Sequence, residues 1–289
     1  MNTISQKSYA KINLNLNVVG KTKNLHKLQS IVSLISLYDE ISLRQIGGRN
    51  HKILFKGKFS KKITSRNTIY KTLSVLDKKK LLKKKYLVTV KKNIPVKSGM
   101  GGGSMNAATL IKIFMKNKII KINKKKLQKI NDSIGQDVKL GFFKNIMYLD
   151  GNNSVKILNK KTKYFLLLFM PKYGCSTKYI FSKVKKYSKP LKNIKNKLNN
   201  LGSLKNDLQD IVIKKYPELK KPIEFLENQP GINFVKMTGS GSCFVAYSKS
   251  RNSIINSLKN FRKNYPKYWS VLSKTISVSY THLRAHETQ

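Results

Sequence analysis

Apolar and polar residues alternate strictly near the start of the chain, in the stretch SYAKINLNLNVVG at residues 8–20. The apolar positions are Ala10, Ile12, Leu14, Leu16 and Val18, and the polar positions between them are Lys11, Asn13, Asn15 and Asn17. A period of two residues predicts a β-strand with one buried face and one polar face that meets water. Residues 25–46 continue as a mostly apolar segment followed by another strand, which ends at the Gly47–Gly48 turn.

Helical spacing of apolar residues appears first in residues 67–82 and again in residues 124–134. Between these two segments, residues 85–95 form another alternating strand, which leads into a glycine-rich stretch. Residues 104–117 then regain helical spacing, with Ser104 in the position of an N-cap. The middle of the chain therefore predicts a strand, a glycine-rich loop and a helix in direct succession.

The second half of the chain repeats this mixture of strands and helices. The pattern predicts strands near Tyr148 and Phe165, two helices in residues 204–226 that break near Pro217, and two strands around a glycine turn in residues 231–248. Residues 183–200 are rich in Lys and Asn and predict a mobile surface helix or linker. The alternation of elements predicts an α+β fold with a division near residues 155–160.

The composition indicates a globular protein. With 289 residues and 40% apolar content, the chain is long enough for one large domain or two ordinary ones. It has no apolar run long enough to span a membrane, and its first residues lack the apolar core of a secretory signal. Cys175 and Cys243 lie far apart without metal-ligand spacing, which argues against a disulfide framework or a zinc site. We expect a cytoplasmic protein without a membrane partner.

The formal net charge of +48, from 60 Lys and Arg against 12 Asp and Glu, raises the possibility of nucleic-acid binding. Only six of the 60 basic residues are arginines, however, although Arg reads phosphates and bases better than Lys. Lys, Asn and Ile are abundant together, as an A/T-rich genome would produce. We therefore attribute the charge to solvated lysines, and expect only salt-sensitive, non-specific binding of nucleic acid.

The end of the chain differs in composition from the rest. The stretch SYTHLRAHETQ at residues 279–289 contains no lysine and two of the four histidines. It looks like translated adapter or vector sequence, so we expect residues 280–289 to be a non-native tail.

The glycine-rich stretch IPVKSGMGGGSMNAA, residues 94–108, contains four of the sixteen glycines, at Gly99 and Gly101–Gly103. Consecutive glycines between a strand and a helix let several backbone N–H groups converge on an anion, and the helix N-terminus adds its positive end. Phosphate is the expected ligand, and the alternative is a tight turn without one. Two common phosphate loops are excluded, because Asn15 precedes GKT where a P-loop needs glycine and Ser104 replaces the third glycine of a dinucleotide fingerprint.

Three separated segments, YAKINLNL, IPVKSGMGGGSMNAA and MTGSGSCFVAY, resemble the three motifs of the GHMP small-molecule kinases in order and spacing. Four more, NLHKLQSIVSLISLYDEI, IGQDVKLGFF, STKYIF and KNDL, are similar to segments of the GHMP kinases that act on 4-diphosphocytidyl-2-C-methyl-D-erythritol. The resemblance runs from about Tyr9 to Tyr247. It implies a two-domain fold, with a ribosomal S5 domain 2-like N-terminal domain over residues 1–158 and an α/β C-terminal domain over residues 159–279.

The resemblance also implies the reaction, which is transfer of the ATP γ-phosphoryl group to the 2-hydroxyl of the cytidylylated methylerythritol in the non-mevalonate route to isoprenoids. Mg²⁺ would accompany ATP, no residue is assigned as a metal ligand, and a homodimer is possible. Homoserine and mevalonate kinases of the same superfamily are the first alternative. A basic nucleic-acid-binding protein, or a GHMP relative without catalytic activity, is the second.

The ATP-binding residues implied by the resemblance lie in and beside the glycine-rich loop. They are Pro95, Gly99, Met100, Gly101, Gly102, Gly103, Ser104 and Asn106. Lys97 and Ser98 depart from the family pattern, which usually has glycine or alanine there. Lys97 either adds a phosphate contact or is one more surface lysine.

The implied catalytic residues are Asp137, which would accept or orient the proton of the substrate hydroxyl, and Lys11, which would lie beside it and stabilise charge on the transferred group. The alternative for Asp137 is a helix or turn cap. Lys139 and Leu140 replace a proline–aromatic pair that is usual in the family, and Tyr9 replaces a proline.

The substrate-binding residues implied by the resemblance are His26, Asn13, Thr177, Phe181, Gly239 and Gly241. His26 would meet the cytosine edge, although Leu25 stands where the family has an aromatic residue. Phe181 would be a second platform for the base, and the alternative is an ordinary core position. Asp207 lies in another segment that resembles the substrate side, and Cys243 is expected to be a small packed residue.

Overall fold

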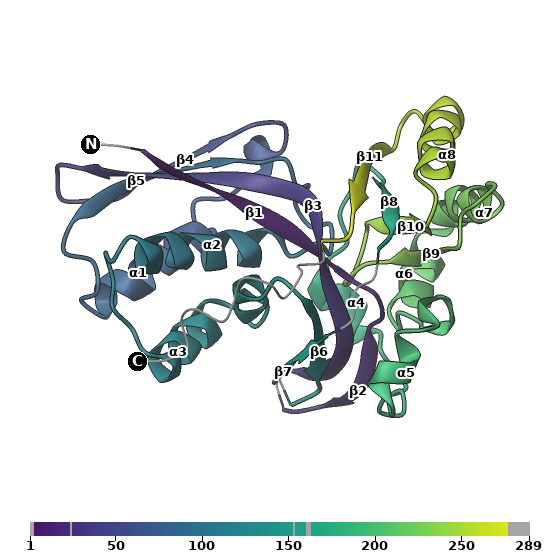
Figure 1. Ribbon diagram of the computed structural model, residues 1–289, viewed down its shortest axis with the longest axis horizontal. Helices are drawn as coiled ribbons and strands as arrows, with labels where there is room; N and C mark the ends of the chain where they lie inside the picture. Colours follow the sequence, from purple (N-terminus) through teal and green to yellow (C-terminus); the bar gives the residue numbers. More distant parts are fainter. Residues whose placement is uncertain (1–2, 24, 153, 160–162, 277–289) are drawn as a thin grey trace.

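A computed structural model describes residues 3–23, 25–152, 154–159 and 163–276 of the chain, and the predicted tail at 280–289 lies outside the described residues. Within these ranges the chain forms two β-sheets and several helices (Figure 1). The strands are β1 Ile4–Asn13, β2 Asn17–Lys21, β3 His26–Ile46, β4 Lys52–Lys56, β5 Lys85–Lys91, β6 Ile146–Asp150, β7 Val155–Leu158, β8 Phe165–Met170, β9 Phe234–Met237, β10 Phe244–Ser248 and β11 Trp269–Lys274. The helices are α1 Thr68–Lys78, α2 Gly102–Lys116, α3 Lys124–Ile134, α4 Thr177–Ser182, α5 Ile194–Lys197, α6 Gln209–Lys215, α7 Lys220–Glu227 and α8 Arg251–Asn264, with 3₁₀ turns η1 Ser60–Lys62, η2 Val138–Phe142, η3 Leu201–Ser203 and η4 Pro217–Leu219.

The first sheet is organised around β3, whose 21 residues form one continuous strand. The expectation of two elements in residues 25–46 is therefore wrong. Strand β3 is continuous because neighbouring strands pair with both of its parts. Its first part pairs with β2 and β6, and its later part pairs with β1 and β5. Strands β4 and β7 complete the sheet at its two edges.

The alternating stretch at residues 8–20 forms two strands rather than the single one expected. The interruption lies at Asn15, whose side-chain Oδ1 accepts the backbone N–H of Ile31 at 2.7 Å, and β2 then continues along β3 in the same direction as β1. The expectation that the polar face meets water is also wrong for its centre, since Lys11, Asn13 and Asn15 are only 5%, 4% and 1% exposed. Lys11 and Asn13 instead face a cleft at the junction of the two sheets, and Asn15 faces the backbone of β3.

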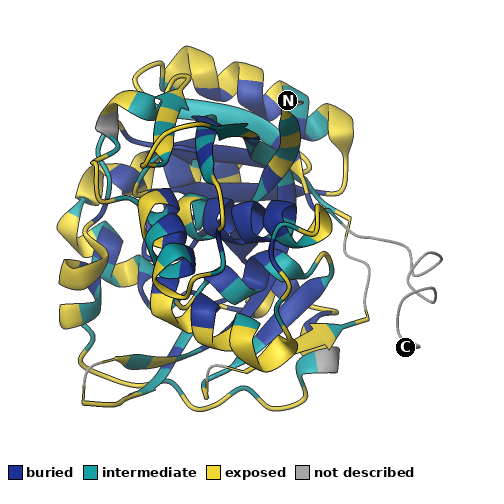
Figure 2. Ribbon diagram, turned by 90° about the vertical axis from the view of Figure 1, so that its left-hand side faces the viewer, coloured by how far each residue is buried: buried dark blue, intermediate teal, exposed yellow. Residues whose placement is uncertain are grey.

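Helix α2 packs on β1 and β3 and is flanked by α1 and α3, as predicted from the apolar spacing of these segments. It begins at Gly102, so the expected cap at Ser104 is wrong. Its N-cap is Gly101 at φ 65°, a left-handed conformation that glycine adopts without steric penalty. Figure 2, seen from the side of these helices, shows buried residues in the interior and exposed ones on the outer helix surfaces.

The second sheet has the order β11-β8-β10-β9, with neighbouring strands antiparallel. Helices α7 and α8 cover one face, and the other face shares an apolar core with β1 and β3 of the first sheet. The predicted helix break near Pro217 and the predicted strand pair in residues 231–248 are confirmed as α6 and α7 and as β9 and β10. Strand β11, which the sequence pattern did not predict, closes this sheet beside β8.

Residues 183–200 are largely irregular and contain only the short helix α5. Both cysteines are buried and free of a disulfide, in agreement with the sequence expectation. Among the described residues, no helix is both long and apolar enough to cross a membrane.

Candidate active site

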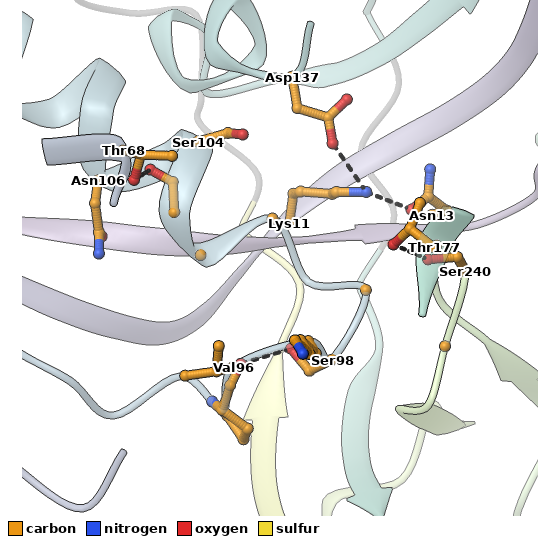
Figure 3. A pocket seen from close by; sticks show the side chains of 18 of the residues that line it. Lys11, Asn13, Thr68, Val96, Ser98, Ser104, Asn106, Asp137, Thr177 and Ser240 are labelled. Atoms are coloured by element: carbon orange, nitrogen blue, oxygen red, sulfur yellow. Dashed lines mark hydrogen bonds and ion pairs between the residues drawn. The ribbon is translucent and has the colours of Figure 1, made fainter. Parts of the chain in front are cut away.

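A cleft of about 520 Å³ opens where the two sheets meet, and most of the predicted site residues line it (Figure 3). Those residues are Lys11, Asn13, Pro95, Gly99, Gly101, Gly102, Gly103, Ser104, Asn106, Asp137, Thr177, Phe181, Gly239 and Gly241. They come from β1, the glycine-rich loop, the start of α2, the turn before η2, α4 and the turn between β9 and β10. Tertiary folding therefore gathers segments that are more than 200 residues apart in the sequence.

Lys11 and Asp137 face each other across this cleft (Figure 3). The Lys11 ammonium lies 3.4 Å from Oδ2 of Asp137 and donates a hydrogen bond to Oδ1 of Asn13 at 2.7 Å. Asn13 is fixed in turn, because its amide donates to Ser30 Oγ at 2.7 Å and its backbone N–H donates to Thr238 Oγ1 at 3.0 Å. Lys11 is nearly buried whereas the Asp137 side chain is 40% exposed, so the carboxylate is open to a ligand.

The capping alternative for Asp137 is wrong. The residue stands at the N-cap of η2, but its side chain makes no capping hydrogen bond within the described part of the chain. Its carboxylate turns toward the Lys11 ammonium instead. Asp137 thus occupies a capping position in the chain, but its side chain contacts Lys11 in the cleft.

The glycines of the loop clear space for protein atoms as well as for a ligand. A Cβ on Gly99 would lie 2.1 Å from the backbone oxygen of Thr238, and a Cβ on Gly239 would lie 2.6 Å from the oxygen of Gly99. The two glycine turns are thus in backbone-to-backbone contact. Gly101 similarly admits the Lys11 side chain, because a Cβ there would lie 2.9 Å from its Cγ.

Met100 is separated from the other predicted ATP-binding residues. Its side chain is fully buried in the core shared by the two sheets and does not line the cleft. Only its backbone takes part in the site, because its carbonyl oxygen accepts the Lys11 N–H at 3.1 Å.

Lys97 lines the cleft and is exposed. Its φ of 55° places it in the left-handed region, which is unusual for a residue other than glycine. Gly174 makes room for its side chain, because a Cβ on Gly174 would lie 2.6 Å from the Cβ of Lys97. Lys97, in the glycine-rich loop, therefore packs closely against the segment that leads into α4.

His26 and Phe181 form an aromatic pair, of which Phe181 lines the cleft and His26 does not. Their ring centroids are 5.2 Å apart at an angle of 34°, and His26 lines an adjoining hollow of about 340 Å³ together with Asp137. Burial and, to a smaller extent, the nearby charge of Lys21 lower the pKa of His26, which favours the neutral imidazole. Leu25 is 53% exposed and supplies an aliphatic edge to the same hollow.

Thr177, at the start of α4, is joined to the turn between β9 and β10. Its Oγ1 lies 2.9 Å from Oγ of Ser240. This contact links the C-terminal segments on one wall of the cleft.

Asp207 does not reach the cleft. Its Oδ2 accepts the backbone N–H of Val18 at 2.7 Å, which fixes the start of β2. Its neighbour Asn206, to which sequence reasoning gave no role, donates to the carbonyl oxygens of Met237 and Gly239 at 2.9 Å each. Asn206 thereby braces the second glycine turn.

Asp39 is a second residue that sequence reasoning missed. It is fully buried on β3, and its carboxylate accepts hydrogen bonds from Lys92, Asn93, Ile94 and Asn106 at the two ends of the glycine-rich loop. A signal was present in the sequence, since an acid in an apolar strand is unusual in a chain with only 12 Asp and Glu.

Cys243 is fully buried, and burial raises the pKa of its thiol, so it is a packed residue as expected. Within the described ranges, no group of three or more His, Cys, Asp or Glu side chains is arranged to hold a metal ion.

Comparison with known proteins matches two family models to the chain. "GHMP kinases N terminal domain" matches residues 67–144, and "GHMP kinases C terminal" matches residues 184–267. The 4-diphosphocytidyl-2-C-methyl-D-erythritol kinase of Pelagibacter ubique is 46% identical over 281 residues, which cover 96% of this chain and all of the relative.

Two solved structures share the fold. A crystal structure of 4-(cytidine 5'-diphospho)-2C-methyl-D-erythritol kinase superposes with a TM-score of 0.79 at 20% identity, covering 95% of this chain and 100% of the other. The homoserine kinase of Cytophaga hutchinsonii superposes with a TM-score of 0.69 at 14% identity, covering 96% and 95%.

Proposed function

Because this chain belongs to the 4-diphosphocytidyl-2-C-methyl-D-erythritol kinases, a family of GHMP kinases, we propose that the cleft between its two sheets is the active site of that reaction. The enzyme is a small-molecule kinase that transfers the γ-phosphoryl group of ATP to the 2-hydroxyl of 4-diphosphocytidyl-2-C-methyl-D-erythritol in isoprenoid biosynthesis. The observation that supports the proposed site best is the Lys11–Asp137 pair beside the glycine-rich loop.

Asp137 is the proposed base for the acceptor hydroxyl. Its exposed carboxylate can accept the hydroxyl proton or fix the direction from which the oxygen attacks. The adjacent Lys11 ammonium, 3.4 Å from Oδ2 of Asp137, can stabilise negative charge on the phosphoryl group during transfer. Asn13 and the Thr238 turn hold Lys11 in position, so the charge is preorganised.

The glycine-rich loop and the N-terminus of α2 are the proposed site for the ATP phosphates. Backbone N–H groups and the positive end of a 15-residue helix both favour an anion there. This arrangement suits phosphoryl transfer, which depends mainly on positioning and charge stabilisation.

Mg²⁺ is the proposed companion of ATP. This ion keeps several waters and binds through one or two carboxylates together with substrate phosphates, so it does not need the three-residue cluster that is absent from the described chain. The Ser104 hydroxyl at the start of α2 is one of the oxygen donors in the cleft that would hold the ion together with the ATP phosphates, which leaves Asp137 to act on the acceptor. When bound, the ion would neutralise phosphate charge.

His26 and Phe181 are the proposed site for the cytosine ring. A neutral imidazole offers one donor and one acceptor nitrogen to the base edge, and the ring of Phe181 offers an apolar face. Thr177, Asn13, Gly239 and Gly241 also line the cleft and would contact the rest of the acceptor.

We propose domains over residues 1–158 and 159–279, a cytoplasmic location and a possible homodimer. We further propose that the lysine-rich surface binds no specific nucleic acid, which the scarcity of arginine supports.

The test is ADP release by the chain without residues 280–289, supplied with Mg²⁺ and ATP and with 4-diphosphocytidyl-2-C-methyl-D-erythritol, homoserine or mevalonate in turn. We expect turnover only with the cytidine compound. Turnover with homoserine or mevalonate instead would contradict the proposed acceptor site.

A further inference from the structure

The carboxylate of Asp39 joins the two ends of the glycine-rich loop. On the incoming side, its Oδ1 accepts the backbone N–H groups of Asn93 at 2.8 Å and Ile94 at 2.9 Å. On the outgoing side, its Oδ2 accepts the side-chain amide of Asn106 at 2.9 Å, within the first turns of α2. One side chain on β3 thus fixes the positions where the loop leaves β5 and where it enters the helix.

The Lys92 ammonium completes the set of partners of Asp39. It forms an ion pair and hydrogen bond with Oδ2, and both residues are buried, at 5% and 0% exposure. An ionised carboxylate has about four acceptor positions, and all four are used here. A complete set of partners is needed here, because a buried charge that lacks full hydrogen bonding destabilises the folded state.

The partners of Asp39 reach the cleft although Asp39 does not. Lys92 and Asn106 line the cleft, and so does Pro95, which follows Ile94 directly. The Lys92 ammonium also lies beside the helix N-terminus, because a Cβ on Gly102 would be 3.3 Å from its Nζ. A displacement of the carboxylate would therefore move groups on both sides of the proposed phosphate site.

We propose that Asp39 is a positioning residue for ATP, which holds the glycine-rich loop, Lys92 and Asn106 in the geometry that receives the nucleotide. Stability alone does not explain the arrangement, since a buried ion pair contributes little more than well-packed apolar residues of similar volume. The proposal rests on the proposed function of the cleft, but it concerns ATP binding rather than the choice of acceptor.

The test compares Asp39→Asn and Asp39→Glu with a matched control, Asp77→Asn. Asp77 likewise pairs with a lysine, Lys85 at 2.8 Å, and with His51 at 3.1 Å, but it does not line the cleft. Binding of a non-hydrolysable ATP analogue with Mg²⁺ is measured by calorimetry, without any acceptor. Urea unfolding then reports the folded fraction of each variant.

We expect both Asp39 variants to weaken binding of the analogue about tenfold or more, which corresponds to at least about 1.4 kcal/mol. Their KM for ATP should rise by the same factor while the KM for the acceptor changes less than about twofold. Asp77→Asn should lose stability and keep wild-type affinity for the analogue. A purely structural role of Asp39 would reduce the active fraction and kcat without this selective change in KM for ATP.

Two results would overturn the proposal. One is folded Asp39 variants that bind the analogue as tightly as the wild type. The other is failure of both Asp39 variants to fold while Asp77→Asn folds, which would assign Asp39 to folding. Failure of the proposed function has a different signature, because the wild type would then bind the analogue but not phosphorylate the cytidine compound.

Discussion

At the scale of single residues, the role of a side chain depends on where the fold places it. Lys11 is one of many lysines, yet it is nearly buried beside Asp137, whereas most of the others are solvated. Asp137 occupies a capping position without capping, and its carboxylate remains open to the cleft. Residue type alone would have assigned both to ordinary surface roles.

Replacement of Asp137 by Asn should reduce kcat by about 100-fold or more, because a general base contributes roughly 10²- to 10⁴-fold. Binding of ATP should change little, since the glycine-rich loop is untouched. Steady-state ADP release and calorimetry with the ATP analogue measure the two effects. The exposed Asp132, on α3, provides the control, and Asp132→Asn should keep wild-type kcat.

Replacement of Lys97 by Gly tests whether this lysine acts on the nucleotide. Lys118, at φ 56° and exposed, has the same strained conformation outside the cleft. Glycine adopts this conformation freely, so both Lys97→Gly and Lys118→Gly should raise the free energy of unfolding by up to about 1 kcal/mol. Only Lys97→Gly should raise the KM for ATP, by a few fold, because it removes a cation from the cleft. Equal KM values for ATP in the two variants would mean that Lys97 is an ordinary surface lysine.

At the scale of elements, the site depends on contact between two glycine turns from different sheets. The glycine-rich loop and the turn between β9 and β10 touch through Gly99, Thr238 and Gly239, and the backbone N–H of Cys243 donates to Ser98 O at 3.3 Å. This contact fixes the width of the cleft between the Lys11 side and the Thr177 side. Glycine is needed there because no side chain fits between the two backbones.

Replacement of Gly99 by Ala should therefore destabilise the protein by about 3 kcal/mol or more, since the new Cβ would meet Thr238 O at 2.1 Å in a left-handed conformation. Gly47→Ala is the control, because no described atom lies within 4 Å of a Cβ at that position. Its effect should stay within about 0.5 kcal/mol. Urea unfolding measures both, and a small loss for Gly99→Ala would mean that the two turns can separate easily.

At the scale of the whole molecule, the net charge of +48 imposes self-repulsion on the folded state. A few lysines are also buried. Burial lowers the pKa of Lys236 to about 8, and burial with the nearby charge of Lys144 lowers that of Lys112 to about 8. Lys236 donates to the carbonyl of Leu201, and Lys112 donates to that of Gly141 at 2.6 Å.

These two lysines predict that stability rises with pH. Between pH 8 and 10.5 the unfolded chain binds more protons than the folded one, because their pKa is about 8 when folded and 10.5 when unfolded. The free energy of unfolding should therefore increase from pH 8 to about pH 9. Above that pH, Cys175 and Cys243, whose thiol pKa is raised by burial, oppose the increase, and the tyrosines with raised pKa follow. Lys236→Met should make this slope shallower, and urea unfolding at several pH values measures it. An unchanged slope would mean that groups other than Lys236 cause the pH dependence.

The sequence by itself determined the elements whose signals are local. Apolar spacing predicted α1 and α3, Pro217 predicted the break between α6 and α7, and glycine between two apolar runs predicted β9 and β10. The order of its motifs also indicated the family, and most of the site residues that it implied do line the cleft. These features depend on neighbouring residues or on a linear pattern, so no distant contact was needed to recognise them.

Only the tertiary structure decided the features that depend on distant partners. The unbroken length of β3, the interruption at Asn15, and the pairing of β11 with β8 follow from hydrogen bonds between remote segments. The same holds for Asp39, whose four donors come from both ends of a loop more than 50 residues away. A periodic pattern records which residues are buried, but not which partner a buried polar group meets, and that partner determines its role.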